Sequence, residues 1–238
     1  GSTLTTNTGS LAIDGDADNS TVGGNQTSNA ITLASNVTLN ANTTVTLDAT
    51  NGNITSTTGT LTLTSVDGVT INDSLTTNGD LTISGTSNVS LLTVATGADV
   101  STTNNDIVIT IHDIDLDGTL SSGADNITIT QTIAGADTSI GDFSTNVDLQ
   151  IDPAELERIT ANELTVNSTE VISVSNITGA NSDNIGTVRL NALVSDVRFF
   201  DANSTFNTLV VTADDDIDFF ASVTTDTGAI SLNAQGTG

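Results

Sequence analysis

Apolar residues in this chain alternate with polar ones in short runs, and the runs return after about twenty residues. Leu61 and Leu63 flank Thr62, and the same pattern recurs at Leu81 and Ile83. Alternation with a period of two is typical of a strand that buries one face, and the β-branched residues in these runs favour strands. A return at a fixed distance predicts stacked units, each of which buries its apolar face against the next.

The same step of twenty aligns apolar residues in several parts of the chain. The aligned pairs are Val69 with Val89, Ile71 with Leu91, Ile107 with Ile127, Ile109 with Ile129, Val197 with Ile217, Phe199 with Phe219, and Phe200 with Phe220. Near the end the step widens to 21, from Val188 to Leu209 to Ile230. We expect each aligned pair to be neighbours on adjacent strands, and we expect the two pairs of Phe rings to stack.

One repeat, between residues 61 and 81, holds three short strands separated by Gly, Asn, Asp or Ser at the corners. A β-sandwich would also give short strands, but it would not superpose residues at a constant step. We therefore predict an all-β fold, a right-handed parallel β-helix (a solenoid) with about 20 residues per coil. About twelve such coils would make a rod of roughly 55–60 Å.

A short helical insertion is predicted at 153–159. Asp152 suits the N-cap of a helix and Pro153 its first position. Leu156 and Ile159 are three residues apart and would face the rod together. We expect the insertion to cover a corner or side of the solenoid, and a docking element for a partner is the alternative.

The chain is interpreted as a single continuous module over residues 1–238, because no linker-like run divides its 238 residues. The period blurs between about 112 and 150, where we expect insertions. Residues 224–230 resemble residues 5–11, which suggests that the two ends have matching coils. The module is therefore predicted to be one unit of a longer tandem array, with adjacent copies of itself as end-to-end partners.

Charge and composition exclude several classes of function. The formal net charge is −26, and the cations are Arg158, Arg189 and Arg198. A partner that is a nucleic acid or an anionic membrane would require the opposite sign, so we predict neither. The chain has no Cys, and therefore no disulfide or thiolate metal site, and no apolar stretch long enough for membrane insertion.

Two acidic runs have a spacing suited to calcium, because alternating carboxylates place hard oxygen ligands in one tight loop. These runs are Asp14, Asp16 and Asp18, and Asp113, Asp115 and Asp117. The Glu that would complete an EF-hand is missing, since the twelfth positions are Asn25 and Ala124. Calcium is the one cofactor predicted here. The alternatives are a solvated loop for the first run and the wet face of a strand for the second.

Catalytic residues are not predicted, and we expect the chain not to be an enzyme. His112 is the one histidine, and no Ser or Cys stands in the context of a nucleophile. A polysaccharide-active enzyme, the third hypothesis, uses paired carboxylates and usually aromatic platforms for sugar rings. The chain has no Trp and no Tyr.

Outward rows of Thr, such as Thr60, Thr62 and Thr64, suggest a side face that recognises a glycan or ice. Threonine is also a good strand residue on a wet face. The T-x-T spacing does not recur at one fixed coil position throughout the sequence. This counts against ice rather than a glycan as the ligand, and we keep the binding module as the second functional hypothesis.

The Thr-, Asn- and Gly-rich coils with L-T-V and I-T-L strands resemble the β-helical shafts of large bacterial secreted exoproteins of the filamentous haemagglutinin type. The segment IDPAELERITANELTV at 151–166 looks like a unit of very large repetitive bacterial surface proteins. This resemblance implies an extracellular or cell-surface stalk or filament for adhesion, with no catalytic residues. We therefore expect a structural shaft that acts as a stiff spacer, with a cell-surface glycan or protein as a further partner.

Overall fold

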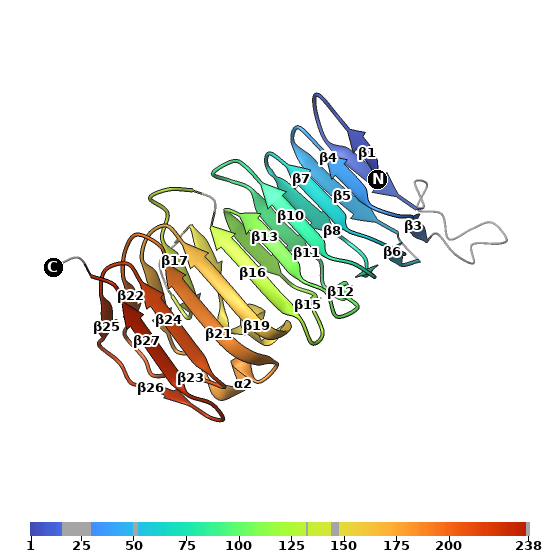
Figure 1. Ribbon diagram of the computed structural model, residues 1–238. Helices are drawn as coiled ribbons and strands as arrows, with labels where there is room; N and C mark the ends of the chain where they lie inside the picture. The colour runs from blue at the N-terminus through green and yellow to red at the C-terminus, as the bar shows by residue number, and fades with distance from the viewer. Residues whose placement is uncertain (16–29, 50–51, 132, 144–147, 237–238) are drawn as a thin grey trace.

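The computed structural model describes residues 1–15, 30–49, 52–131, 133–143 and 148–236 (Figure 1). In this part the chain winds through about 9 turns of an all-β parallel solenoid, about 23 residues apart. The predicted fold class is confirmed. The turns are longer and fewer than the twelve coils of twenty residues that the sequence predicts, because several corners carry extra residues.

Side 1 of the solenoid is an unbroken parallel ladder that runs along the whole rod (Figure 1). Its strands are β1 (Ser2–Thr5), β4 (Val37–Asn40), β7 (Leu61–Ser65), β10 (Leu81–Gly85), β13 (Ile107–Ile111), β16 (Asn126–Gln131), β19 (Ile159–Ser168), β21 (Ile185–Ala192), β24 (Leu209–Ala213) and β27 (Ile230–Ala234). Alternate residues of these strands point inward, and in the middle of the rod they are fully buried. This ladder sets the axis on which the other sides are stacked.

Side 2 consists of two five-stranded parallel sheets, one in each half of the rod. The first contains β2 (Leu11–Asp14), β5 (Thr44–Asp48), β8 (Gly68–Ile71), β11 (Leu91–Val94) and β14 (Asp113–Leu116). The second contains, in spatial order, β18 (Leu149–Ile151), β17 (Thr138–Gly141), β20 (Ile172–Ser175), β22 (Val197–Phe199) and β25 (Ile217–Phe219). The ladder of side 2 is thus interrupted between β14 and β18.

Side 3 changes from strands to helices and back to strands. Its first strands are β3 (Ile31–Leu33), β6 (Ile54–Ser56), β9 (Leu75–Thr77), β12 (Asp99–Thr102) and β15 (Thr119–Ser121), and β15 pairs with the start of β19. Two short helices follow, α1 (Pro153–Glu157) and α2 (Gly179–Ser182), which contact each other. They are succeeded by β23 (Ser204–Phe206) and β26 (Val223–Thr225).

The inward-facing residues of the three sides form one hydrophobic cluster that extends from Leu11 to Ala213. Ile109 and Ile129, neighbours on β13 and β16, have no exposed surface. A single core of this kind requires every coil to stack on the next, which is the energetic reason for repeat architectures. The rod is therefore held together along its whole length rather than in separate clusters.

Most of the predicted neighbours are confirmed, but one register is wrong. The structure aligns Val69 with Leu92, not with Val89, and Ile71 with Val94, not with Leu91. The turn at residues 86–90, between β10 and β11, adds three residues, and the backbone N–H groups of residues 86 and 87 both donate to the Val66 carbonyl within it. The side chain of Val89 is consequently 66% exposed.

One of the two predicted Phe stacks is present. The rings of Phe199 and Phe219 lie parallel, 5.1 Å apart and at an interplanar angle of 2°. Phe200 instead makes an edge contact with Phe143, with ring centroids 5.3 Å apart. Phe220 is 74% exposed, because the chain turns after β25 and carries this side chain away from the rod. The second predicted stack, of Phe200 on Phe220, is therefore wrong.

The predicted helical insertion is confirmed as α1. The side chain of Asp152 accepts a hydrogen bond from the Glu155 backbone N–H, and the side chain of Glu155 accepts one from the Asp152 backbone N–H, which makes a capping box. Leu156 and Ile159 are both fully buried against the rod, as predicted. The second helix, α2, was not predicted, because its residues Gly-Ala-Asn-Ser carry no helical pattern.

The insertion expected between 112 and 150 lies within the longest coil of side 1. Thr130 on β16 aligns with Asn167 on β19, 37 residues later. The additional residues include β17, which precedes β18 in the chain but is inserted between β18 and β20 in space. The ladder of side 1 continues across this coil without a break, so the extra chain is accommodated on sides 2 and 3.

Replacing Gly68 with Ala should destabilise the protein by at least about 2 kcal/mol. Its φ is +139°, and an added Cβ would lie 2.2 Å from the Leu91 carbonyl oxygen on the neighbouring strand. Gly97→Ala is the matched control, since Gly97 also has a positive φ (+84°) but has nothing within 4 Å of an added Cβ. Chemical denaturation of both variants checks this, and equal losses of stability would contradict it.

Candidate functional site

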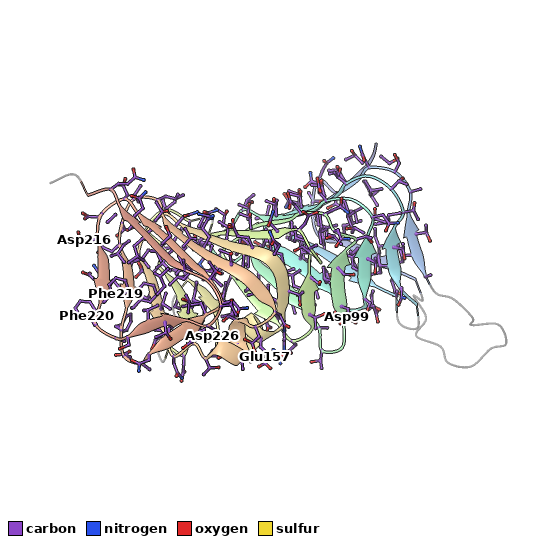
Figure 2. All side chains as sticks on the ribbon, turned by 60° about the horizontal axis from the view of Figure 1, so that its bottom comes forward. Asp99, Glu157, Asp216, Phe219, Phe220 and Asp226 are labelled. Carbon is purple, nitrogen blue, oxygen red and sulfur yellow. The ribbon has the colours of Figure 1, made fainter. Side chains whose placement is uncertain are left out.

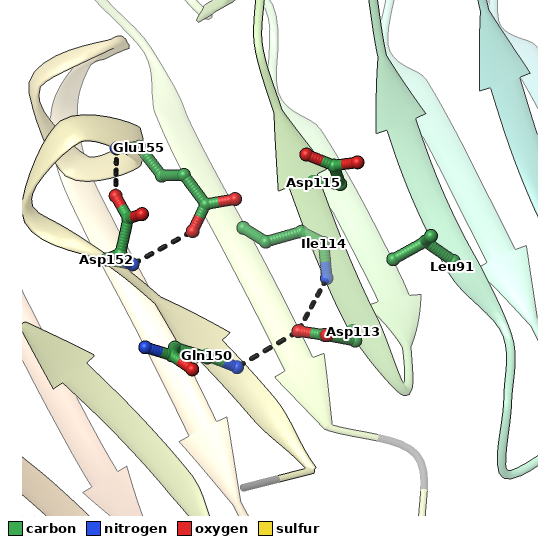
Figure 3. A pocket seen from close by; sticks show the side chains of 7 residues that line it. All are labelled: Leu91, Asp113, Ile114, Asp115, Gln150, Asp152 and Glu155. Carbon is green, nitrogen blue, oxygen red and sulfur yellow. Dashed lines mark hydrogen bonds between the residues drawn. The ribbon is translucent and has the colours of Figure 1, made fainter. Parts of the chain in front are cut away.

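A hollow of about 340 Å³ lies where side 2 is interrupted, between the edge of β14 and the segment that leads into α1 (Figure 3). Four of its seven lining residues are acids. The lining residues are Leu91, Asp113, Ile114, Asp115, Gln150, Asp152 and Glu155. The hollow brings four acidic side chains together in one concave site, and so it is the first candidate for a functional site.

Glu155 joins α1 to the edge of β14. Its Oε1 accepts a hydrogen bond of 3.0 Å from the backbone N–H of Leu116, and its Oε2 accepts one of 2.9 Å from that of Asp152. Arg158, at the end of α1, donates from Nη1 to the Leu116 carbonyl oxygen at 2.6 Å. The two side chains therefore supply the donor and acceptor that a next strand would have supplied to Leu116.

Asp113 has the same role on the other side of the hollow. One of its carboxylate oxygens accepts from the backbone N–H of Ile114 at 2.9 Å and from that of Gln150 at 3.0 Å (Figure 3). The bond to Gln150 connects β14 in the first sheet of side 2 to β18 in the second. Carboxylates thus bridge the seam where the backbone ladder is missing.

Burial makes both carboxylates harder to ionise. The pKa of Glu155 is raised to about 7, chiefly because the side chain is desolvated and also because Asp152 and Asp113 are close. Burial also raises the pKa of Asp113, against the opposing effect of its hydrogen bonds to Gln150 and Ile114. Shifted carboxyl groups are common in catalytic sites, but structural seams produce them too.

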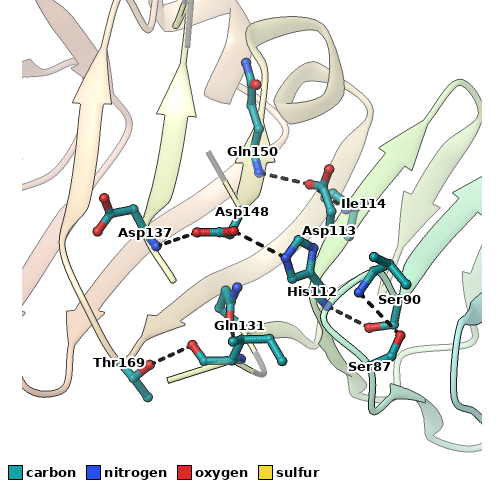
Figure 4. A network of polar contacts seen from close by, with 12 residues as sticks. Ser87, Ser90, His112, Asp113, Ile114, Gln131, Asp137, Asp148, Gln150 and Thr169 are labelled. Atoms are coloured by element: carbon teal, nitrogen blue, oxygen red, sulfur yellow. Dashed lines mark hydrogen bonds and ion pairs between the residues drawn. The ribbon is translucent and has the colours of Figure 1, made fainter. Parts of the chain in front are cut away.

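A second polar network lies next to the seam (Figure 4). The imidazole Nε2 of His112 is 3.4 Å from a carboxylate oxygen of Asp148, and the other oxygen of Asp148 accepts from the Asp137 backbone at 3.2 Å. The backbone N–H of His112 donates to the Ser90 hydroxyl at 3.1 Å. No described hydrogen bond joins the His112 ring to a hydroxyl, so the residues in view do not form a triad of nucleophile, base and acid.

The buried carboxylates of the hollow are engaged with backbone N–H groups, and this arrangement is suited to closing a strand edge. A glycosidase would require two carboxyl groups that face a sugar, with one free to donate a proton. Glu155 and Asp113 each already accept two backbone hydrogen bonds. The expectation that the chain is not an enzyme stays a prediction.

The residues predicted to bind calcium occupy three kinds of position. Asp16 and Asp18 lie outside the described residues, and Asp14 ends β2. Asp113 and Asp115 alternate on β14 with Asp117 just beyond it, and the last two are exposed, as the alternative of a wet strand face predicts. Among the described residues, a different set of three carboxylates is close together. One oxygen from each of Asp196, Asp215 and Asp216 lies within 4.8 Å of the other two. Calcium binding stays a prediction.

If Asp14, Asp16 and Asp18 bind calcium, millimolar calcium should raise the melting temperature, because an ion that binds the folded state stabilises it. The replacement Asp14→Asn should reduce this rise. Thermal unfolding with calcium, compared with sodium chloride at matched ionic strength, checks the prediction. An equal rise with both salts would leave screening of the −26 net charge as its cause.

The outward face of side 1 carries two parallel rows of small residues, all of them polar except Val108. The first row reads Thr3, Thr38, Thr62, Thr82, Val108, Thr128 and Thr165, and the second reads Thr5, Asn40, Thr64, Ser84, Thr110, Thr130 and Asn167. Each residue is aligned with its neighbours in adjacent strands. T-x-T itself occurs in three of these seven strands, β1, β7 and β16, so it recurs at this position but not throughout, as the sequence predicts.

The Thr rows end where a charged pair lies on the same face. Arg189, which follows Thr165 in the first row, donates from Nε and Nη2 to the two carboxylate oxygens of Glu163, both at 2.9 Å. The guanidinium of Arg189 lowers the pKa of Glu163, so this pair stays ionised at neutral pH. The six strands of side 1 from β1 to β16 carry no charged side chain.

Comparison with models of known families, with curated proteins and with solved structures found no match to this chain. In the described part of the chain, neither helix has the length or apolar character of a membrane span.

Proposed function

We propose that this chain is a structural shaft, a stiff segment that spaces or displays other parts of an extracellular bacterial surface protein. The observation that carries the proposal is the unbroken ladder of side 1 over one continuous core. Bending such a rod would separate strands that share both backbone hydrogen bonds and buried side chains. The carboxylate bridges from Asp113 and Glu155 support the same role, because they hold the rod together where side 2 is interrupted.

The high negative charge also suits a shaft. A net charge of −26 makes copies repel each other sideways, which keeps neighbouring rods apart and soluble. The filamentous haemagglutinin-like resemblance of the Thr- and Asn-rich coils supports an extracellular location. Antibodies against the chain should then label intact cells that produce it, and labelling only after permeabilisation would contradict that location.

Stiffness can be measured directly, because the chain has no Cys and introduced thiols are the sole labelling sites. Spin labels at Ala12→Cys and Thr224→Cys, exposed positions on the first and last coils, should give one narrow distance distribution. The matched control is Ala12→Cys with Thr46→Cys, neighbours on β2 and β5, which measures the width due to the labels alone. A distribution much broader than the control would contradict a stiff shaft.

A second candidate function is favoured by the Thr rows of side 1, which form a lattice with two fixed spacings. The spacing is about 4.8 Å between strands and about 6.6 Å between alternate residues along a strand. A single soluble ligand does not need such a repeat, whereas a crystalline surface does. Crystalline polysaccharide is usually bound by aromatic residues, and Trp and Tyr are missing here. Ice, to which hydroxyl and methyl groups are both suited, is therefore the ligand proposed for this face.

Adsorption of the fluorescently labelled chain to a growing ice surface tests this second function. Thr62→Lys with Thr82→Lys, both on side 1, should abolish adsorption, while Thr55→Lys with Thr76→Lys on side 3 should leave it intact. No adsorption by the unaltered chain, or equal loss in both double variants, would overturn the ice proposal. Binding to insoluble cellulose or chitin in place of ice would assign the face to a glycan.

A further inference from the structure

The C-terminal end of the rod exposes its core. β25, β26 and β27 each pair with one strand, on their inner side, in the described part of the chain. Residues that would be buried in the middle of the rod are exposed here: Phe219 is 47% exposed, Ile230 38% and Leu232 47%. Figure 2 shows Phe219 and Phe220 on the last coil, at this end of the rod. Three strand edges and a patch of apolar side chains are thus presented together.

The N-terminal end has a complementary form. β1, β2 and β3 are the first strands of the three sides, and among the described strands each pairs only with the strand that follows it in the stack. A hollow of about 310 Å³ opens there, lined mainly by apolar residues that include Leu4, Ile13, Leu33, Val37 and Leu39. Leu4 is 49% exposed. This end therefore offers three edges and a recess into the core.

We propose that a second copy of this chain docks head to tail, with its β1 added to β27 so that side 1 continues from one copy into the next. The inference deepens the proposed shaft function and rests on it, because it names the partner of the shaft. All strands of side 1 are parallel, so a copy translated along the axis arrives with β1 in the direction that β27 requires. An edge strand is a template for such pairing.

The pleat of the two strands fixes the register of the contact. On β27, Ile230 and Leu232 continue the inward columns of Leu209 and Val211, and Ser231 points outward. On β1, Ser2 and Leu4 continue the inward columns of Val37 and Leu39, and Thr3 points outward. The in-register arrangement places Leu232 against Leu4 of the second copy and Ser231 beside its Thr3. The exposed Phe219 then faces the apolar recess.

This contact joins different surfaces of the two copies, so it does not close on itself and can extend into a filament. The acids near the C-terminal end include Asp216, Asp218 and Asp226, and Asp14 is close to the other end. Like charges therefore oppose docking at low ionic strength. Association should increase as salt screens them, the reverse of what an ion-paired interface would show.

Sedimentation equilibrium of the 238-residue chain at two salt concentrations tests the proposal. Self-association is expected to strengthen at the higher salt concentration, and Leu232→Asp should weaken it at least tenfold. Val89→Asp is the matched control, because Val89 is an exposed apolar residue on the side of the rod, away from both ends. Thermal unfolding shows whether each variant is folded. A chain that stays monomeric, or equal weakening by both variants, would overturn the inference.

Disulfide trapping tests the register. Thr3→Cys and Ser231→Cys, carried by separate copies in a chain with no other Cys, should form a linked dimer on oxidation. Thr3→Cys with Asp218→Cys should not, because Asp218 is on β25 of side 2. A link through Asp218→Cys in place of Ser231→Cys would overturn the continuation of side 1. The spin-label distances that test the shaft are measured within one copy. A stiff monomer that fails to associate therefore refutes this inference alone. A flexible monomer refutes the shaft.

Discussion

Replacing Ile129 with Asp should unfold much of the rod, at a cost on the order of 4 kcal/mol or more. Ile129 has no exposed surface and lies between Ile109 and Val166 in an inward column of side 1. A carboxylate at this position would be buried with no partner. Because each coil is stabilised by its neighbours, the loss should spread to the coils on both sides. Urea denaturation followed by circular dichroism measures the change.

Thr128→Asp is the control for this substitution. Thr128 is the adjacent residue on β16 and faces outward, so its carboxylate remains solvated. Its effect should stay within about 1 kcal/mol. If the two variants unfold at the same urea concentration, the inward and outward assignment of this strand is wrong.

Raising the pH from 4.5 to 7 should destabilise the chain, and Glu155 should account for roughly 3 kcal/mol of the change. Its pKa is about 7 in the folded protein and near 4.5 as a free side chain. The folded state therefore holds the proton more tightly, and the stability it gains is complete below pH 4.5 and lost as the pH rises through 7. The pH dependence of the contribution of Glu163 to stability has the opposite sign. Its pKa is lowered in the folded protein, so its contribution is lost in acid.

Glu155→Gln separates this effect from the general repulsion of the acidic surface. Glutamine resembles the protonated acid and does not titrate, so the variant should lose much less stability across the same pH range. Glu157→Gln, on the exposed side of the same helix, should retain the full loss. Thermal melting between pH 4.5 and 7 gives the comparison, and parallel pH profiles for all three proteins would show that Glu155 is not the group responsible.

The fold could be predicted because the alternation of apolar and polar residues, and its recurrence at a nearly constant step, can be read from the sequence itself. Where a coil is 20 or 21 residues long, as from Ile107 to Ile127 or from Val188 to Leu209, counting along the chain finds the true neighbour. It fails where a corner gains residues, as before Leu92. The size of a corner depends on turn hydrogen bonds that leave no periodic signal, and for this reason the number of coils was overestimated.

The acidic hollow could be predicted only in part. The Asp152 and Glu155 capping box is visible in the sequence, but the second bond of Glu155 reaches Leu116, 39 residues away. That contact exists because side 2 is interrupted, which no local pattern reports. The alignment of the outward Thr residues into rows was not predicted for a related reason, since Thr38 and Thr62 are 24 residues apart and fall outside a step of twenty. An alignment that allows corners of variable length would have found it.

The ladder of side 1 also has a consequence for how the chain acquires its structure. Adjacent strands along it are separated by at most 37 residues, so each new coil needs only a short length of additional chain. Loop closure over such distances costs less entropy than closure between distant segments, so these strand pairs form faster than pairs far apart in the sequence would. A chain that emerges from one end can therefore add coils in order onto those already formed. Growth of this kind requires no distant segment to be present. A longer rod is therefore no harder to fold than a shorter one.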